Sequence, residues 1–238
     1  MAGPRFFVDP ADIAGGQAVL RGGEAEHLRV VLRAGPGTAV SLADGTGRVH
    51  EARVVRVARA EVTLQLGAVG HEPPASPRLC VVHGLPKRRK LDEVVQRLSE
   101  IGVDRIVPVT TQRSEVSLDA EGAAKVVARW RAVALAAAKQ SRRARVLEVA
   151  DVGTWTGAFP AGAAGAVLWE EAEVPLRAAL DVTAGELFLG IGPEGGLTRV
   201  EVEGSGLPAA TLGPTILRTE TAALVAAAAV LTLSGRLA

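Results

Sequence analysis

Two glycine-proline stretches near the C-terminus decide how this chain folds. The first runs from Ile191 to Thr198 and reads IGPEGGLT, and the second runs from Leu212 to Ala222 and reads LGPTILRTETA. Each follows a short apolar run typical of a buried strand, and each leads into a helical pattern. Glycine turns at the ends of neighbouring strands let backbone amides and carbonyls approach a ligand. Residues 192–197 are called the first loop below, and residues 212–218 the second loop.

The first loop, taken alone, fits either a plain strand-to-helix turn with Glu194 in solvent or a ligand site. Adjacent Gly195 and Gly196 permit positive φ and leave space where side chains would stand. Thr198 and Glu201 have the spacing of a capping box, which predicts that a helix begins there. The second loop is needed to decide between the two interpretations.

The second loop mixes apolar side chains with a turn, a combination that suits an adenine ring held by apolar contacts and backbone hydrogen bonds. Arg218, Thr219 and Glu220 follow at a helix start, where exposed N–H groups favour an anion. The two loops lack both the GxxxxGK[ST] and the strand-associated GxGxxG phosphate-binding patterns. Together they predict a cofactor site of another kind.

Composition and charge narrow the class of protein. The 238 residues are 48% apolar and carry a formal net charge of +1, so a nucleic-acid partner would have to meet a local basic patch. Of the 27 basic residues only 4 are lysines. Arginine matches phosphate with a planar fork, which suits RNA contact, although a GC-rich genome produces the same bias.

Several site classes are excluded by the sequence. The single Cys80 lies in an apolar run and reads as a buried structural thiol, which excludes a disulfide framework and a cysteine zinc site. The four histidines show no metal-ligand spacing. The chain has no uninterrupted membrane span and no signal-peptide pattern at its start, so we expect a cytoplasmic protein without metal or membrane partners.

The chain divides by pattern into two domains. Residues 1–70 show short β-rich segments broken by glycine turns, with one helix expected over 23–33, and predict a small β-barrel. Residues 71–77 hold three prolines and predict a linker. Residues 78–238 alternate between strands and helices and predict an α/β domain with a mainly parallel sheet.

The expected elements of this second domain are these: strands over 79–83, 105–109, 145–149, 166–169, 186–191 and 209–212, and helices over 90–101, 120–140 and 219–233. The last helix is almost wholly alanine, valine and leucine. A helix that is apolar all round is buried either beneath its own domain or against a second subunit, and we favour the second subunit.

The two loops resemble those of the SPOUT methyltransferases, most closely the RsmE family, which methylates N3 of a uridine in small-subunit ribosomal RNA. The family hallmarks are a GPEGG loop and a terminal LGxxILRxETA segment. Further matches are His27 to Arg33, Lys87 to Pro108, the Arg113-Ser114 pair, and Trp130 with Gln140-Ser141-Arg143, so the resemblance covers nearly the whole chain. It departs from the family pattern mildly at Leu197, Arg97, Ser99 and Gln112, which bears on substrate contacts.

The resemblance implies a C-terminal SPOUT trefoil-knot domain that holds S-adenosylmethionine, a PUA-like N-terminal barrel that binds RNA, and a homodimer with its active site between subunits. The substrate implied is 16S ribosomal RNA or the assembled small subunit. Two alternatives stay open: a methyltransferase of the same fold acting on another rRNA base or on tRNA, and a non-catalytic RNA-binding protein.

Candidate site residues follow from the motifs. The expected cofactor-binding residues come from three strand ends and are Leu168, Ile191, Gly192, Gly196, Leu212, Gly213, Ile216 and Leu217. Glu194, Arg218 and Glu220 are the candidate catalytic residues. Glu194 would place charge near the sulfonium or take the N3 proton, and Arg218 would bind phosphate or the uracil anion. The plainer interpretation of Arg218 is an ion pair with Glu220 or Glu194.

RNA contact is expected at basic patches. The candidates are Arg5, Arg29, Arg33, Lys87, Arg88, Arg89, Lys90 and Arg113, with a second basic run at Lys139, Arg142, Arg143 and Arg145. The alternative is that these runs are solvated faces. Aromatic residues make up only 3% of the chain, so stacking on bases is not expected to dominate.

Overall fold

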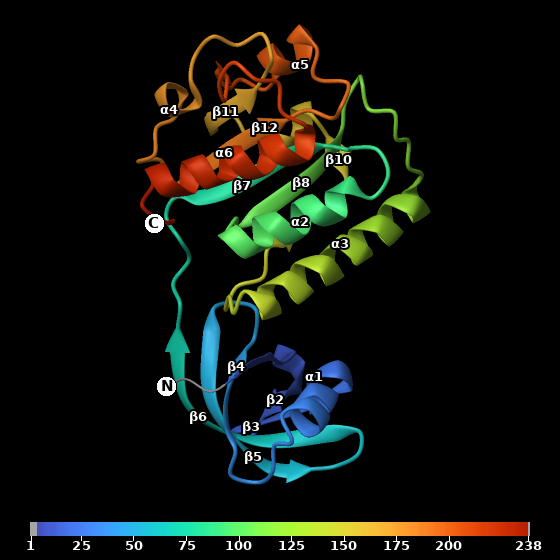
Figure 1. Cartoon of the computed structure of the whole chain (residues 1–238), viewed down its shortest axis with the longest axis vertical. Coiled ribbons are helices and arrows are strands. Elements are labelled where there is room, and N and C mark those ends of the chain that lie inside the picture. Colours follow the sequence, from blue (N-terminus) through green and yellow to red (C-terminus); the bar gives the residue numbers. More distant parts are fainter. Residues whose placement is uncertain (1–3, 238) are drawn as a thin grey trace. The chain divides into compact units, whose positions relative to one another are not determined.

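The computed structural model describes residues 4–237 and divides into two compact units (Figure 1). The first unit contains the chain up to Pro74 together with Ala138–Val146, and the second contains Ala75–Ala137 and the chain from Leu147 onward. The division near Pro74 falls inside the proline-rich segment 71–77. The inclusion of residues 138–146 in the first unit was not anticipated from the sequence.

The first unit is built on a six-stranded sheet. Its strands are β1 (Arg5–Phe7), β2 (Ile13–Ala14), β3 (Gln17–Arg21), β4 (Ala39–Ala43), β5 (Arg48–Val57) and β6 (Glu61–His71), paired in the order β1-β4-β5-β6-β3-β2. All pairs are antiparallel except β1 with β4. Among the described residues no pairing joins β1 to the two-residue β2, so the expected barrel is not closed by hydrogen bonds.

The strands surround one apolar core that includes Phe6, Leu28, Leu42 and Leu64. A short 3-10 helix, η1 (Pro10–Asp12), precedes β2. The helix expected over 23–33 begins one residue earlier as α1 (Gly22–Glu26) and continues as a π-helical turn, η2 (His27–Val31).

Residues 138–146 belong to the first unit because they bond to its loops. Arg145 bridges to Gly45 and Thr46, and its guanidinium donates to the carbonyl of Glu72 at 2.8 Å. Lys139 forms a 2.6 Å ion pair with Glu24. Because of these contacts, the strand expected over 145–149 begins only at Glu148. The contacts also pair two cations of the second basic run, Lys139 and Arg145, with other groups of the protein.

The second unit is built on a seven-stranded parallel sheet. Its strands are β7 (Arg78–Gly84), β8 (Arg105–Thr110), β9 (Glu148–Val149), β10 (Gly153–Thr154), β11 (Ala164–Leu168), β12 (Glu186–Ile191) and β13 (Ala209–Ala210). The order is β10-β8-β7-β12-β11-β13, with β9 also on β8. Their apolar runs are long and continuous because both faces of the central strands are covered.

The helices of this unit are α2 (Lys90–Ile101), α3 (Ala120–Gln140), α4 (Leu176–Ala179), α5 (Arg199–Gly204) and α6 (Thr219–Leu233), with a 3-10 turn η3 (Thr156–Ala158). The predicted bounds of α2, α3 and α6 agree with the structure. α2 buries Leu91, Val94, Val95 and Leu98, the stripe expected from the sequence.

α6 packs against β7, β12 and α2 of its own unit (Figure 1). Ala223, Ala227 and Val230 are fully buried there, while Val225 and Leu233 remain exposed. The buried face therefore has an explanation within the single chain, which supports the interpretation that we did not favour from the sequence. Only the smaller face with Val225 and Leu233 is left exposed.

The short strand β13 has hydrogen-bonded neighbours on both sides. Residues 208–211 hydrogen-bond on one side to β11, with Val167 donating to the Pro208 carbonyl. On the other side, Thr211 donates to the Val174 carbonyl and accepts from Leu176 through its own carbonyl. Residues 208–211 therefore lie between β11 and residues 174–176, the segment that follows β11.

Cys80 lies at the centre of the parallel sheet with no exposed surface, and burial raises the pKa of its thiol to about 12. It is a structural thiol, as predicted.

Over residues 4–237, no helix is both long and apolar enough to span a bilayer. The same residues contain no cluster of His, Cys, Asp and Glu arranged to hold a metal ion.

Candidate cofactor and catalytic site

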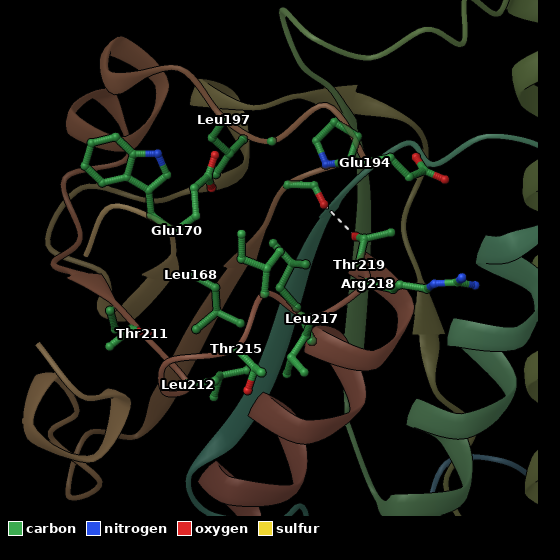
Figure 2. Close-up of a pocket in the computed structure, with 18 of the residues that line it drawn as sticks. Leu168, Glu170, Glu194, Leu197, Thr211, Leu212, Thr215, Leu217, Arg218 and Thr219 are labelled. Atoms are coloured by element: carbon green, nitrogen blue, oxygen red, sulfur yellow. Dashed lines mark hydrogen bonds between the residues drawn. The ribbon is translucent and has the colours of Figure 1, made fainter. Parts of the chain in front are cut away.

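The two glycine loops line one pocket of about 560 Å³ (Figure 2). All eight residues expected to bind a cofactor border it, as do Glu194, Arg218 and Lys90. The full lining is Lys90, Leu168 to Glu170, Ile191 to Leu197, Ala210 to Thr219, and Ala222. The structure therefore brings together residues that are up to 132 positions apart in the sequence.

Strand register explains why the loops meet. β11 pairs in parallel with β12, where Leu168 lies opposite Ile191, and with β13, where Leu168 lies opposite Ala210. The three strands therefore end at the same edge of the sheet, and their following loops lie side by side. Ligands of parallel α/β sheets bind at this carboxyl edge.

The first loop is anchored by the start of α5. Thr198 and Glu201 form the predicted capping box: the Thr198 backbone N–H donates to Glu201 Oε2 at 2.9 Å, and the Glu201 N–H donates to Thr198 Oγ1. Glu201 Oε1 also accepts from the backbone N–H of Gln112 at 2.7 Å. Because Glu201 is only 5% exposed, this carboxylate ties the first loop to the segment after β8.

Replacing Glu201 with alanine is expected to destabilise the protein. The change leaves two backbone donors, of Thr198 and Gln112, without their charged acceptor, and we expect a loss of about 2 kcal/mol in the free energy of unfolding. Urea unfolding followed by circular dichroism measures it. The control is Glu203→Ala on the same helix, an exposed position where we expect a change within about 0.5 kcal/mol. Equal effects of the two changes would contradict the anchoring role.

Arg113 lies directly against the first loop. Its guanidinium donates to the Gly195 carbonyl at 3.3 Å, and a Cβ on Gly195 would stand 2.9 Å from the Arg113 carbonyl oxygen. The close backbone approach requires glycine at this position. Gly196 in turn has φ of +72°, a conformation that side chains disfavour. Arg113, expected to bind RNA, is thus also part of the packing of this loop.

Lys90 joins three elements at the edge of the pocket. Its ammonium lies 3.1 Å from Glu194 Oε1 in the first loop and 3.4 Å from Glu220 Oε2 at the start of α6. All three side chains are partly buried. Lys90 was expected to bind RNA as part of a basic run, but it is the counter-ion of the two candidate catalytic carboxylates.

Glu194 stays ionised in this arrangement. Burial raises the pKa of its carboxyl group, but hydrogen bonds from the backbone N–H groups of Glu194 and Lys87 and from Lys90 outweigh burial and leave the pKa below its ordinary value. The Glu194 hydrogen bond, followed by the charges around it, raises the pKa of Lys90. A carboxylate with a lowered pKa is a weak base but a stable negative charge.

Arg218 is exposed, and within residues 4–237 its guanidinium makes no hydrogen bond or ion pair. The plainer interpretation, an ion pair with Glu220 or Glu194, is therefore not observed, because Lys90 occupies both carboxylates. In Figure 2, Arg218 and Glu194 lie on one side of the pocket, and Leu168 and Leu212 on the other. The side with Leu168 and Leu212 is mainly apolar and also holds the carboxylate of Glu170, whereas Glu194 and Arg218 make the other side charged.

The second loop supplies most of the apolar side. Leu212 and Leu217 are half-buried, whereas Ile216 is 89% exposed at the rim. Thr211 holds the turn: its hydroxyl donates to the Gly213 carbonyl at 3.0 Å and accepts from the Gly213 N–H at 3.2 Å. An apolar slot bordered by backbone groups is what an adenine ring requires.

The remaining candidates for RNA contact fall into two classes. Arg5 donates to the Arg142 carbonyl at 2.6 Å and pairs with Glu72, and Lys87 pairs with Glu115 at 2.7 Å, so these cations are engaged within the protein. The exposed candidates are Arg29, Arg33, Arg88 and Arg89. RNA binding by all of them stays a prediction.

Sequence reasoning missed several residues of the pocket. Trp169 and Glu170 follow β11, and Thr219 opens α6. Glu170 was detectable only as a polar residue after a strand. Thr219 was named at the start of a helix but not as a site residue. His83, the second-last residue of β7, does not line the pocket but contacts Thr219, and it gave no signal in the sequence.

Residues 73–231 match the RNA methyltransferase domain family. The "Ribosomal RNA small subunit methyltransferase E" of Mycobacterium bovis is 36% identical over 97% of this chain and 92% of its own length. This chain belongs to the ribosomal RNA small subunit methyltransferase E family. The enzyme of the same name from Bacillus subtilis is 31% identical over 89% of this chain and 88% of its own.

Solved structures place the methyltransferase E fold over the whole chain. The Neisseria gonorrhoeae methyltransferase E bound to S-adenosyl methionine has a TM-score of 0.84 at 31% identity and covers 97% of this chain and 98% of its own. A putative methyltransferase from Legionella pneumophila, in complex with the same cofactor, has a TM-score of 0.85 at 26% identity and covers 98% of both chains. The predicted family and fold class are confirmed.

Proposed function

We propose that this protein is an S-adenosylmethionine-dependent methyltransferase that modifies N3 of a uridine in 16S small-subunit ribosomal RNA. The observation that carries the proposal is the single pocket shared by the two glycine loops. Membership of the methyltransferase E family and its relatives solved with the cofactor support the same function. The site would act in the cytoplasm, where bacterial ribosomal RNA is found.

The residues of the pocket fit this cofactor. S-adenosylmethionine supplies an electrophilic methyl group on a positively charged sulfur. Leu168, Leu212 and Leu217 offer apolar contact, and the loop glycines leave backbone groups accessible to an adenosine and an amino acid. Ionised Glu194, held by Lys90, gives the charged side a lasting negative charge that favours a sulfonium.

Uridine N3 carries a proton, which must be removed when the methyl group is transferred to this nitrogen. Because Glu194 stays ionised through a lowered pKa, we assign it an electrostatic role and not that of proton acceptor. Among the described residues, Arg218 is the unpaired cation of the pocket, and it stabilises the negative charge that develops on the uracil as the N3 proton passes to solvent water at this exposed side. Glu220, paired with Lys90, positions that ammonium beside Glu194.

RNA binding is assigned to the PUA-like N-terminal domain, residues 1–70, and to the start of the 78–238 methyltransferase domain, with 71–77 as linker. Arg29 and Arg33 are exposed in the first unit, and Arg88 and Arg89 in the second.

We also propose a homodimer, supported by the exposed Val225 and Leu233 on α6. Sedimentation velocity tests the dimer directly.

RNA affinity should fall as the salt concentration rises. The number of arginines that contact phosphate should determine how steeply it falls. Each phosphate contact on a single strand contributes about 0.7 to the slope of log affinity against log salt. The double variant Arg88→Ala/Arg89→Ala should therefore bind more weakly, with a slope shallower by about 1.4. Fluorescence anisotropy at several salt concentrations measures it. Arg97→Ala, whose guanidinium already pairs with Glu93, is the control and should keep the wild-type slope.

Methyl transfer to defined RNAs tests the proposed function. Protein is incubated with methyl-labelled cofactor and with assembled small subunits, naked 16S rRNA or tRNA, and the modified nucleoside is identified by mass spectrometry. Label recovered as 3-methyluridine in 16S rRNA supports the proposal. Label in tRNA or on another base would favour the related methyltransferase, and absence of both transfer and calorimetric cofactor binding would favour a non-catalytic RNA-binding protein.

A further inference from the structure

A buried histidine contacts Thr219, a residue that lines the cofactor pocket. His83 is the second-last residue of strand β7 and has no exposed surface, and Gly84, which ends the strand, is also buried. The site described above assigns no role to this pair. A fully buried imidazole is uncommon unless its nitrogens are hydrogen-bonded, so its partners indicate what it does.

One ring nitrogen of His83 is committed to the backbone. Nδ1 lies 2.7 Å from the Gly84 carbonyl oxygen, which can only accept, so Nδ1 carries the hydrogen. Burial lowers the pKa of His83, which leaves the imidazole neutral at pH 7 and Nε2 without a hydrogen. Nε2 is therefore an acceptor.

Thr219 stands between the histidine and the first loop. Its hydroxyl oxygen is 3.3 Å from His83 Nε2 and 2.6 Å from the Gly192 carbonyl oxygen, to which it donates. Figure 2 draws this bond between Thr219 and the loop. The hydroxyl has a single hydrogen, which points mainly to the Gly192 carbonyl, the shorter contact. Nε2, which carries no hydrogen, has the longer and weaker contact with the hydroxyl, and both side chains are buried.

A second contact links β7 to the same loop. Gly84 lies so close to Pro193 that a Cβ on this glycine would stand 2.6 Å from Pro193 Cδ. The end of β7 therefore meets the first loop at two successive residues: at Gly192 through Thr219, and at Pro193 directly. Thr219 also opens α6, immediately after the second loop. One hydroxyl thus connects both cofactor loops.

We propose that Thr219 and His83 are positioning residues for the cofactor: Thr219 holds the Gly192 carbonyl in place, and His83 acts through Thr219. The inference rests on the proposed cofactor site. It predicts that the two loops keep their mutual geometry before the cofactor arrives, and that loss of the hydroxyl lowers cofactor affinity.

The experiment compares Thr219→Val, which keeps the side-chain shape, with Thr219→Ser, which keeps the hydroxyl. Calorimetry with S-adenosylmethionine should show binding weakened roughly threefold to tenfold by Thr219→Val, the effect of one hydrogen bond, and little changed by Thr219→Ser. In cofactor-free protein, amides of residues 192–197 should exchange faster in Thr219→Val. Unfolding midpoints of all variants are measured alongside.

A double-mutant cycle tests the part played by His83. His83→Phe should weaken cofactor binding in the wild-type background and add little in the Thr219→Val background. If the phenylalanine variant does not fold, His83→Gln replaces it. The inference alone would be overturned if Thr219→Val bound the cofactor as tightly as wild type. It would also be overturned if the His83 substitution weakened binding as much in the Thr219→Val protein as in wild type. Failure of the wild-type protein to bind cofactor would instead overturn the proposed function.

Discussion

Replacing Arg218 with alanine should lower kcat by about 100-fold to 1000-fold, the effect of removing one group that stabilises developing negative charge. The guanidinium is the unpaired cation of the pocket among the described residues, and Lys90 is neutralised by Glu194 and Glu220. Cofactor affinity should change little, because the apolar side of the pocket is untouched. Steady-state methyl transfer to small subunits, with calorimetry for the cofactor, separates the two quantities.

Arg177→Ala is the matched control, since Arg177 is exposed on α4 and does not line the pocket. It should leave kcat within about twofold of wild type, as expected for a surface substitution. If Arg218 serves only to bind phosphate, its loss should raise the KM for RNA while kcat is kept. Normal turnover by Arg218→Ala would remove this residue from the catalytic role.

Replacing Gly195 with alanine should weaken cofactor binding by about tenfold, the effect expected if the displaced first loop loses about one hydrogen bond to the cofactor. The new Cβ would stand 2.9 Å from the carbonyl oxygen of Arg113. The Arg113 carbonyl belongs to the backbone and cannot change rotamer as a flexible side chain can. The first loop must therefore move to accommodate the new Cβ. Calorimetric titration with S-adenosylmethionine measures the loss of affinity.

Gly185→Ala provides the comparison for this variant. Gly185 precedes β12 and has ordinary φ, and no atom lies within 4 Å of a Cβ built on it. Its affinity for the cofactor should equal that of wild type. A Gly195→Ala protein that binds as tightly as Gly185→Ala would show that the close approach at Arg113 does not determine the shape of the pocket.

The cofactor loops were predictable because their signals are local. Glycine, proline and a capping box mark the turns, and an apolar run before each turn marks a strand, so the parallel sheet and its edge site follow. The bounds of α2, α3 and α6 also agree with the structure, since amphipathic or wholly apolar helices of this length have strong patterns.

What the sequence did not reveal depends on contacts distant along the chain. Lys90 reads as one more cation in a basic run, and only the fold places it between Glu194 and Glu220. Arg145 was expected to begin a strand, yet it forms isolated β-bridges with Gly45 and Thr46 and donates to the Glu72 carbonyl. The composition of α6 likewise could not show that the helix is buried within its own unit. A wholly apolar helix has the same composition whether it packs beneath its own domain or against a second subunit.

Amide hydrogen exchange with and without S-adenosylmethionine tests most directly the central claim that the two loops form one cofactor site. The account predicts slower exchange on adding cofactor in both 192–197 and 212–218, at the same concentration and to a similar extent. Protection of only one loop, or protection confined to residues outside the pocket, would contradict it.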